Sequence, residues 1–311
     1  MVPDLPSPPH FDPGATGKIW RVDYGRRAAE AEAWARELGI GHPSGDAPRV
    51  GLLLVDCQNT FCVPGYELFV AGRTGHAAVD DNTRLCEFIY RNLDAVTEIT
   101  ATLDTHTALQ IFHPIFWIDD DGAHPVGGET EITLADVETG RWKPNPAVAA
   151  SLTDGDTEWL ERYARHYVRR VTEGRYPLMV WPYHAMLGSI GHALVSAVDE
   201  AVFFHSVARQ TAARFEVKGG TPLTENYSVL SPEVTLGPGD EQIAVPNLEL
   251  FEHFLGFDAV IVAGQAASHS VALLPCGHNF PSCTTLSSES VTTKRSDIAP
   301  ITVAIFDDCG T

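Results

Sequence analysis

The chain has 311 residues, of which 44% are apolar, so it can form one large or two modest domains with a substantial core. Its 41 acidic residues outnumber the 21 basic ones, and the formal net charge of −20 argues against nucleic acid and anionic membranes as partners. No apolar run approaches the roughly 18 residues of a membrane span, and the first residues lack the basic start and apolar core of a signal peptide. Six scattered cysteines without zinc-finger pairing predict reduced thiols and a cytoplasmic protein.

Helices and strands are predicted to alternate along the chain. Residues 1–48 should form an arm and a helix over 26–38, because this Ala- and Glu-rich stretch ends at Gly39. Apolar stretches predict strands over residues 50–55, 98–103, 178–180, 214–217, 259–263 and 301–306. Apolar residues at helical spacing predict further helices over residues 82–96 (capped by Asn82), 159–171, 194–207 and 248–255.

This alternation predicts an α/β fold with a mostly parallel, doubly wound sheet of about six strands. We expect residues 49–311 to form one domain. An irregular excursion at about 118–175 begins with a stretch rich in acidic residues, Gly and Pro. Residues 272–311 are expected to form an atypical carboxyl-terminal segment, because Pro275, Gly277 and Pro281 disfavour a continuous helix and residues 275–299 are rich in Ser and Thr without clear periodicity.

Polar residues at two predicted strand ends suit a metal ion. Asp104 and His106 are two residues apart, so their side chains leave the same face if the strand persists. A carboxylate and an imidazole suit a divalent metal, and one further histidine would complete a facial triad with open positions. His184, after the strand at 178–180, is the candidate for that ligand. His113 competes with it, although packing against Pro114 and Phe116 is the simpler role for His113.

Residues 258–271 suggest a catalytic turn. A buried strand breaks at Gly264 into small residues, and such a turn at the carboxyl end of a parallel strand is where α/β sheets place ligands. Backbone N–H groups there could hold an oxyanion, and Ser270 occupies the expected place of an attacking side chain. An ordinary strand-to-helix turn is the alternative. Asp56 and Lys218 also stand at strand ends, where a turn residue and a solvated lysine are the simpler roles.

Five motifs together resemble a known family. They are DCQNTF at 56–61, DTH at 104–106, WPYH at 181–184, KGGTPLTENYS at 218–228 and GQAASHSV at 264–271. In this order they resemble the isochorismatase-like cysteine hydrolases, and among them most closely the nicotinamidases. The resemblance runs from about Val50 to Val271. It implies the isochorismatase-like hydrolase fold, a three-layer α/β/α sandwich, and the hydrolysis of nicotinamide to nicotinate and ammonia.

The resemblance also implies roles for single residues. Asp56 would be the acid of a catalytic triad, Lys218 its basic partner, and Ser270 stands at the nucleophile position. The N–H groups of Ala266 and Ser270 would form the oxyanion hole, after a cis peptide between Gln265 and Ala266. One divalent metal, zinc first with manganese or iron(II) as alternatives, would be held by Asp104, His106 and His184. The residues implied to bind the substrate are Phe61, Trp181 and Gln265, the two rings enclosing the pyridine.

Ser270 departs from the family pattern, in which the nucleophile is a cysteine. A thiol with a pKa of roughly 8.5 is readily lowered to give a thiolate, whereas a serine hydroxyl needs a strong, aligned base. The chain is therefore expected to be an inactive or trapped form of the enzyme. Two alternatives stay open: a hydrolase of another small amide or carbamoyl compound, and a non-catalytic homologue that binds metal and ligand. The expected partner is a small-molecule amide, and a homo-oligomer stays open.

Overall fold

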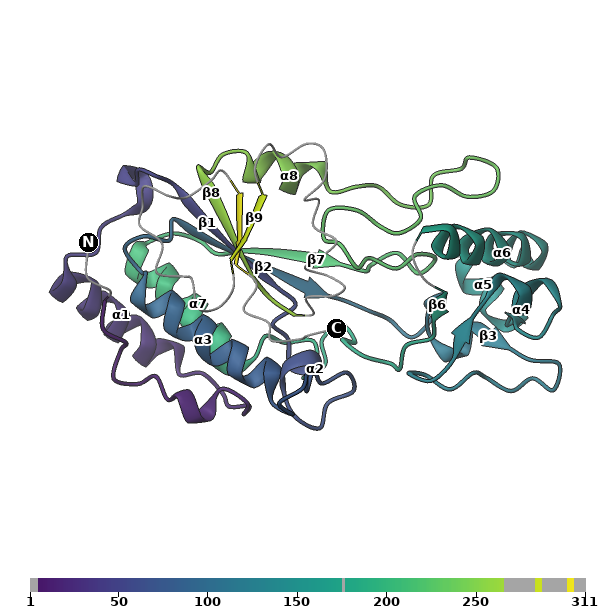
Figure 1. Ribbon diagram of the computed structural model, residues 1–311, viewed down its shortest axis with the longest axis horizontal. Helices are drawn as coiled ribbons and strands as arrows, with labels where there is room; N and C mark the ends of the chain where they lie inside the picture. Colours follow the sequence, from purple (N-terminus) through teal and green to yellow (C-terminus); the bar gives the residue numbers. More distant parts are fainter. Residues whose placement is uncertain (1–4, 175–176, 266–282, 287–300, 305–311) are drawn as a thin grey trace. The chain divides into compact units, whose positions relative to one another are not determined.

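A computed structural model describes residues 5–174, 177–265, 283–286 and 301–304 of the chain (Figure 1). The chain divides into two compact units. The first contains the residues up to 103, residues 193–216 and those from 248 onward, and the second contains residues 104–192 and 217–247. The predicted division after residue 48 stays a prediction. In the described ranges, no helix is both long enough and apolar enough to cross a membrane.

A six-stranded sheet forms the centre of the first unit, in the order β7-β2-β1-β8-β10-β9. Its central strand β1 pairs in parallel with β2 and β8, and β10 pairs in parallel with β8 and β9. The predicted mostly parallel sheet is therefore confirmed. Its strands are β1 (Val50–Val55), β2 (Glu98–Asp104), β7 (Arg214–Lys218), β8 (Ala259–Gly264), β9 (Cys283–Leu286) and β10 (Ile301–Ala304).

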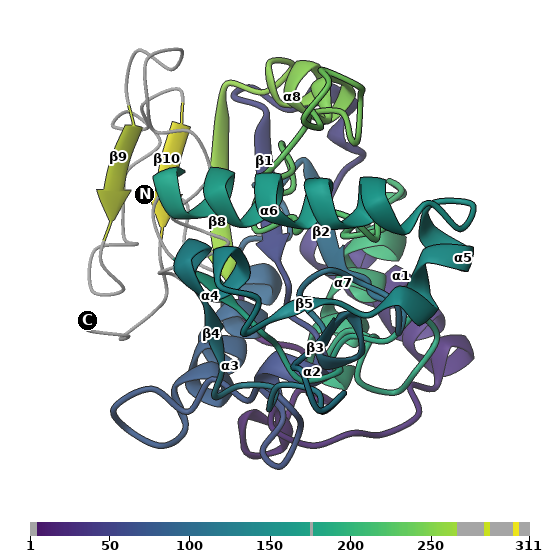
Figure 2. The ribbon, with the colours of Figure 1, turned by 90° about the vertical axis from the view of Figure 1, so that its right-hand side faces the viewer.

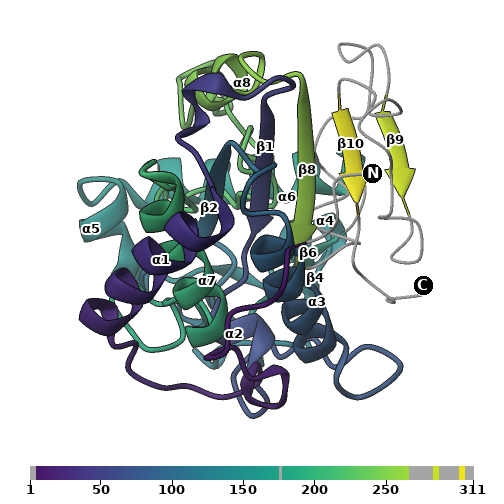
Figure 3. The same ribbon diagram turned by 90° about the vertical axis from the view of Figure 1, so that its left-hand side faces the viewer.

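Both faces of this sheet are covered. Successive side chains of β1 point to opposite faces, so its residues show what packs on each. Leu52 and Leu54 join the core beneath three helices that lie on one face, α1 (Tyr24–Leu38), α3 (Ala77–Arg91) and α7 (Ser196–Arg209) (Figure 3). Leu53 and Val55 pack on the other face with residues that include Phe254 of α8 (Leu248–Phe254). Such burial on both faces explains why β1 is apolar throughout. The expected three-layer arrangement is present in this unit.

The start of α3 differs from the prediction. Asn82 was expected to cap this helix, but α3 begins at Ala77 after His76, and Asn82 lies buried inside it. Alanine is a strong helix former, and Asp80 in the first turn complements the helix dipole. The short helix α2 (Asn59–Cys62) and the 3-10 turns η1 (Pro13–Ala15) and η2 (Pro43–Gly45) complete this unit among the described residues.

Helix α6 (Thr157–Gly174) is the longest helix of the second unit among the described residues (Figure 2). The aromatic core around it fully buries Trp117, Tyr163 and Tyr167. Helix α6 packs on α4 (Leu134–Glu138) and on β5 (Lys143–Pro144). The remaining described elements are β3 (Trp117–Ile118), β4 (Glu131–Ile132), β6 (Leu178–Met179), α5 (Ala149–Leu152), η3 (Pro114–Phe116) and η4 (Pro146–Val148).

The strand predicted at 178–180 does not join the central sheet. Strand β6 pairs antiparallel with β4 in a two-stranded sheet of the second unit, and the pairing joins Leu178 to Ile132. The prediction was wrong because a short apolar stretch shows that a strand is buried but not which strand it pairs with.

Candidate functional site

The local fold of the second unit brings Asp104, His106 and His184 together. Strand β2 ends at Asp104, and the chain continues through His106 with its backbone still extended. The N–H of His106 donates to the carbonyl oxygen of Ala185 at 3.0 Å, and His106 forms a parallel bridge with Met186. This pairing places His184, which precedes Ala185, beside the two residues that end β2.

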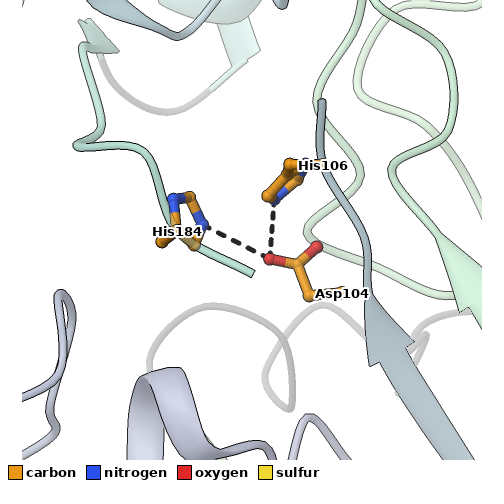
Figure 4. A group of neighbouring side chains, drawn as sticks. All are labelled: Asp104, His106 and His184. Atoms are coloured by element: carbon orange, nitrogen blue, oxygen red, sulfur yellow. Dashed lines mark hydrogen bonds and ion pairs between the residues drawn. The ribbon is translucent and has the colours of Figure 1, made fainter. Parts of the chain in front are cut away.

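The three side chains meet around one carboxylate oxygen (Figure 4). Nε2 of His106 lies 2.8 Å from Oδ2 of Asp104, and Nε2 of His184 lies 3.4 Å from the same oxygen. The three potential ligand atoms all lie within 4.8 Å of one another. Each residue is buried, with at most 4% of its surface exposed. A buried carboxylate needs such partners, because an ionised group taken out of water is costly unless hydrogen bonds, an ion pair or a metal ion compensate it.

These residues fit a divalent metal ion. One carboxylate and two imidazoles provide three protein ligands and leave positions open for water or substrate. Metal-binding histidines usually direct their second ring nitrogen to a carbonyl or carboxylate. Nδ1 of His184 does so, lying 2.8 Å from the carbonyl oxygen of Pro182. The predicted set of ligands is thus brought together as expected.

Lys218 contacts the other oxygen of the same carboxylate. Its Nζ donates to Oδ1 of Asp104 at 3.1 Å and to the carbonyl oxygen of Asn226 at 3.0 Å. Burial opposes the charge of Asp104, but His106 and Lys218 hold the pKa of this carboxyl well below its usual value. Burial likewise lowers the pKa of His106, but Asp104 outweighs that effect and raises it. His106 and Lys218 therefore favour the ionised form of Asp104.

His113 is a neighbour of this group rather than a member of it. Its ring centroid lies 5.8 Å from that of His106 and 6.0 Å from that of His184. Its Nδ1 lies 3.3 Å from the carbonyl oxygen of Ala108, and its ring packs on Tyr183 at 4.9 Å. Burial lowers the pKa of His113 to about 3, and the two histidines nearby act in the same direction. His113 is neutral and packs on Tyr183 and Phe112; the predicted packing against Pro114 and Phe116 stays a prediction.

Asp56 lies in the first unit, directly after β1, and is 2% exposed. Its φ of 50° is left-handed, a conformation that Asp adopts more easily than most residues. The hydroxyl of Thr102 donates to Oδ1 of Asp56 at 2.6 Å and accepts from the N–H of Asp56 at 3.0 Å. A buried carboxylate in an unusual backbone conformation at a strand end is a functional candidate. Sequence patterns did not indicate Thr102, which lies inside β2.

The two predicted ring residues lie in different units. Phe61 belongs to α2 of the first unit and packs, partly buried, on its core. Trp181 belongs to the second unit, and its ring centroid lies 6.5 Å from that of His184. The indole Nε1 of Trp181 donates to the hydroxyl of Tyr227 at 3.1 Å, which fixes the ring beside the candidate metal ligands. Tyr227 was not predicted, although it lies in the KGGTPLTENYS motif.

Gln265 follows β8, and its side chain is buried in the first unit. Its Nε2 donates to Oδ2 of Asp81 at 3.3 Å, and its backbone N–H donates to the carbonyl oxygen of Val55 at 2.8 Å. Its substrate-binding role stays a prediction. Ala266 and Ser270 lie outside the described residues, as do the predicted cis peptide and oxyanion hole.

No protein-family model matches the chain, and no curated protein matches it either. Several solved structures do. The yeast nicotinamidase is 15% identical, with 72% of this chain and 78% of that chain covered and a TM-score of 0.39. A nicotinamidase/pyrazinamidase of Acinetobacter baumanii is 16% identical, with 72% and 74% covered and a TM-score of 0.41. The pyrazinamidase of Pyrococcus horikoshii in complex with zinc is 16% identical, with 83% and 100% covered and a TM-score of 0.39. At such identities and TM-scores we rest no argument on the similarity.

Proposed function

We propose that this chain binds one divalent metal ion, zinc in the first place, and is a small-amide hydrolase of the nicotinamidase type. The observation that carries the proposal is the buried group of Asp104, His106 and His184, whose carboxylate also binds Lys218. Four titratable side chains are rarely buried together without a functional reason. The order of the five sequence motifs supports amide hydrolysis, and nicotinamide is the proposed substrate.

In this proposal Oδ2 of Asp104 and Nε2 of each histidine hold the ion, with Pro182 orienting His184. The bound ion would supply Lewis acidity toward a substrate atom or a water molecule. Lys218 keeps Asp104 ionised and oriented through its 3.1 Å contact with Oδ1. Trp181, held by Tyr227, offers a ring on which a planar aromatic amide can stack.

Position 270 decides the rate of the reaction. In the proposed mechanism Asp56 takes the proton of the side chain at position 270, which then attacks the carboxamide carbon. Asp56 returns the proton to the departing nitrogen, ammonia leaves, and water hydrolyses the remaining ester or thioester to the acid and restores the side chain. A cysteine is partly ionised near neutral pH, whereas a serine hydroxyl must lose its proton during the attack. The chain with Ser270 should therefore bind an amide or its acid and hydrolyse the amide very slowly.

A second candidate is a protein that binds the metal and a small ligand without catalysis. Ser270 itself favours this candidate, because the replacement removes the atom on which the chemistry of a cysteine hydrolase depends. The two candidates share the metal site and differ only in whether the remaining groups support turnover.

Ammonia release from nicotinamide and a panel of other small amides separates the two candidates. Zinc-loaded protein would be compared with its Ser270→Cys variant and with a Ser270→Cys, Asp56→Asn double variant. We expect Ser270→Cys to raise hydrolysis by several powers of ten, each tenfold being about 1.4 kcal/mol of barrier. The double variant should lose that gain, because the thiol loses its proton acceptor. A folded, zinc-loaded Ser270→Cys protein that is inert toward every amide would contradict the hydrolase and leave the binding protein.

A further inference from the structure

We propose that Gly219 is a positioning residue for His106: the absence of a side chain at Gly219 leaves the space in which the His106 ring lies, and this contact sets the direction of Nε2. The inference rests on the metal site of the proposed function. It concerns a residue outside the ligand set and follows from close contacts in the second unit.

Gly219 follows β7 and approaches His106 more closely than any other residue type could. A Cβ at position 219 would lie 2.9 Å from Cε1 and 3.1 Å from Nδ1 of the His106 ring. The same Cβ would lie 2.9 Å from the carbonyl oxygen of Thr105. Carbon contacts this short are strongly repulsive. The φ of 85° at Gly219 is also a conformation that glycine adopts without steric cost.

Hydrogen bonds hold both sides of this contact. The side chain of Gln110, which is 1% exposed, donates from Nε2 to the carbonyl oxygen of Gly219 at 2.6 Å. The N–H of Thr105 donates to the carbonyl oxygen of Lys218 at 2.9 Å. On the other side, the backbone of His106 donates to Ala185 at 3.0 Å and accepts from Leu187 at 2.9 Å. Neither segment can withdraw without losing buried hydrogen bonds, so an added methyl group must displace the ring.

The two candidate histidine ligands are oriented in different ways. His184 directs Nδ1 at the carbonyl oxygen of Pro182, 2.8 Å away. Nδ1 of His106 is buried, and it has no hydrogen-bond partner among the described residues. The ring of His106 instead packs edge-on against Phe112, with centroids 4.8 Å apart, and against the backbone at Gly219. Packing therefore orients the ring of His106, whereas a hydrogen bond orients the ring of His184.

This arrangement predicts a loss of metal affinity when Gly219 gains a side chain. Displacing the ring moves Nε2 away from the position that it shares with Asp104 and His184. Removing the groups that orient a metal ligand typically weakens binding about 10- to 100-fold. We therefore expect Gly219→Ala to raise the Kd for zinc at least tenfold.

Two alanine variants of other glycines serve as matched controls. Gly220→Ala changes the next residue, where an added Cβ meets nothing within 4 Å. Gly140→Ala reproduces the left-handed backbone, with a φ of 78°, and its Cβ also meets nothing within 4 Å. Gly220→Ala controls for adding a methyl group to the same segment without a clash. Gly140→Ala controls for the strain of an alanine in a left-handed backbone conformation. Both should bind zinc within about twofold of the unchanged protein.

The experiment measures the Kd for zinc of each metal-free protein by competition with a chromogenic chelator, with circular dichroism as the check on folding. The visible spectrum of the cobalt(II)-loaded proteins gives a second readout, and it should change in Gly219→Ala alone. Equal zinc affinity in Gly219→Ala and the unchanged protein would overturn the inference. Should the unchanged protein not bind zinc, the proposed metal site fails and the inference falls with it.

A second variant keeps the test decisive if Gly219→Ala does not fold. Gln110→Met keeps the bulk of the side chain but removes the donor to the carbonyl oxygen of Gly219, and with it the acceptor for the N–H of Thr107 at 3.2 Å. The Gly219 segment can then shift, and we expect the Kd for zinc to rise about threefold or more while the fold is retained. Unchanged zinc affinity in a folded Gln110→Met protein would contradict the positioning role.

Discussion

Replacing Lys218 with methionine tests the electrostatics of the candidate site. The change removes the ammonium group and keeps an unbranched side chain of similar length. Lys218 is 6% exposed and Asp104 is 4% exposed, so water screens their 3.1 Å contact little. Losing Lys218 leaves a buried carboxylate with one cationic partner fewer. We expect a clear loss of stability.

The size of the loss follows from the contacts that remain. Breaking a buried ion pair by removing one partner typically costs about 3–5 kcal/mol. Asp104 keeps its contacts with Nε2 of His106 at 2.8 Å and Nε2 of His184 at 3.4 Å, and these polar contacts offset part of the loss. We therefore expect a loss at the lower end of this range, about 3 kcal/mol in the free energy of unfolding. For an m-value near 3 kcal/mol/M, this loss lowers the urea midpoint by about 1 M.

Urea unfolding in the presence of a chelator, followed by circular dichroism at pH 7.5, measures this loss. Lys143→Met is the matched control, because Lys143 pairs with Asp120 at 2.9 Å with both side chains exposed to solvent. An exposed pair contributes little, so this control should leave the midpoint unchanged. A Lys218→Met midpoint no lower than that of Lys143→Met would refute the reasoning about buried charge.

Three further predictions concern other parts of the chain. Gly264→Ala should destabilise the protein by more than about 2 kcal/mol in urea unfolding, because its Cβ would collide with the backbone of Val55. An unchanged midpoint would contradict this. Burial lowers the pKa of His205 from 6.5 to about 4, so the unfolded chain binds this proton first and stability should fall by up to about 3 kcal/mol from pH 6.5 to pH 4. The His205→Gln variant should lose less stability between pH 6.5 and pH 4 than the unchanged protein. Equal losses of stability would contradict a lowered pKa for His205. Trp181→Ala should weaken nicotinamide binding to the zinc-loaded protein roughly two- to tenfold by calorimetry, whereas unchanged affinity would remove Trp181 from the site.

Much of the first unit could be predicted from local patterns. Strands β1 and β8 are apolar runs because they are buried on both faces, and such runs are visible in a single sequence. The helix α1 ends at Gly39, whose φ of 68° is the left-handed cap that glycine favours. The pairing of Asp104 with His106 was also predictable, because their two-residue spacing places them on one face of an extended chain.

Features that depend on distant pairing could not be predicted. Strand β9 was missed, since the four residues Cys283–Leu286 lie in a Ser- and Thr-rich stretch without periodicity. The contact of Lys218 with Asp104 and the close approach of Gly219 to His106 join residues more than 100 positions apart. No local pattern records such contacts. The resemblance implies that Lys218 is the basic partner of Asp56 in a catalytic triad. Asp56 belongs to the other unit, and this pairing stays a prediction.

The central claim is that Asp104, His106 and His184 hold one divalent metal ion. Zinc content after loading and exhaustive dialysis, measured by elemental analysis, tests it most directly. We expect about one equivalent in the unchanged protein and in His76→Ala, which removes an exposed histidine elsewhere. His106→Ala and His184→Ala should retain almost none while remaining folded. Equal zinc in the His106→Ala variant and the unchanged protein would contradict the account.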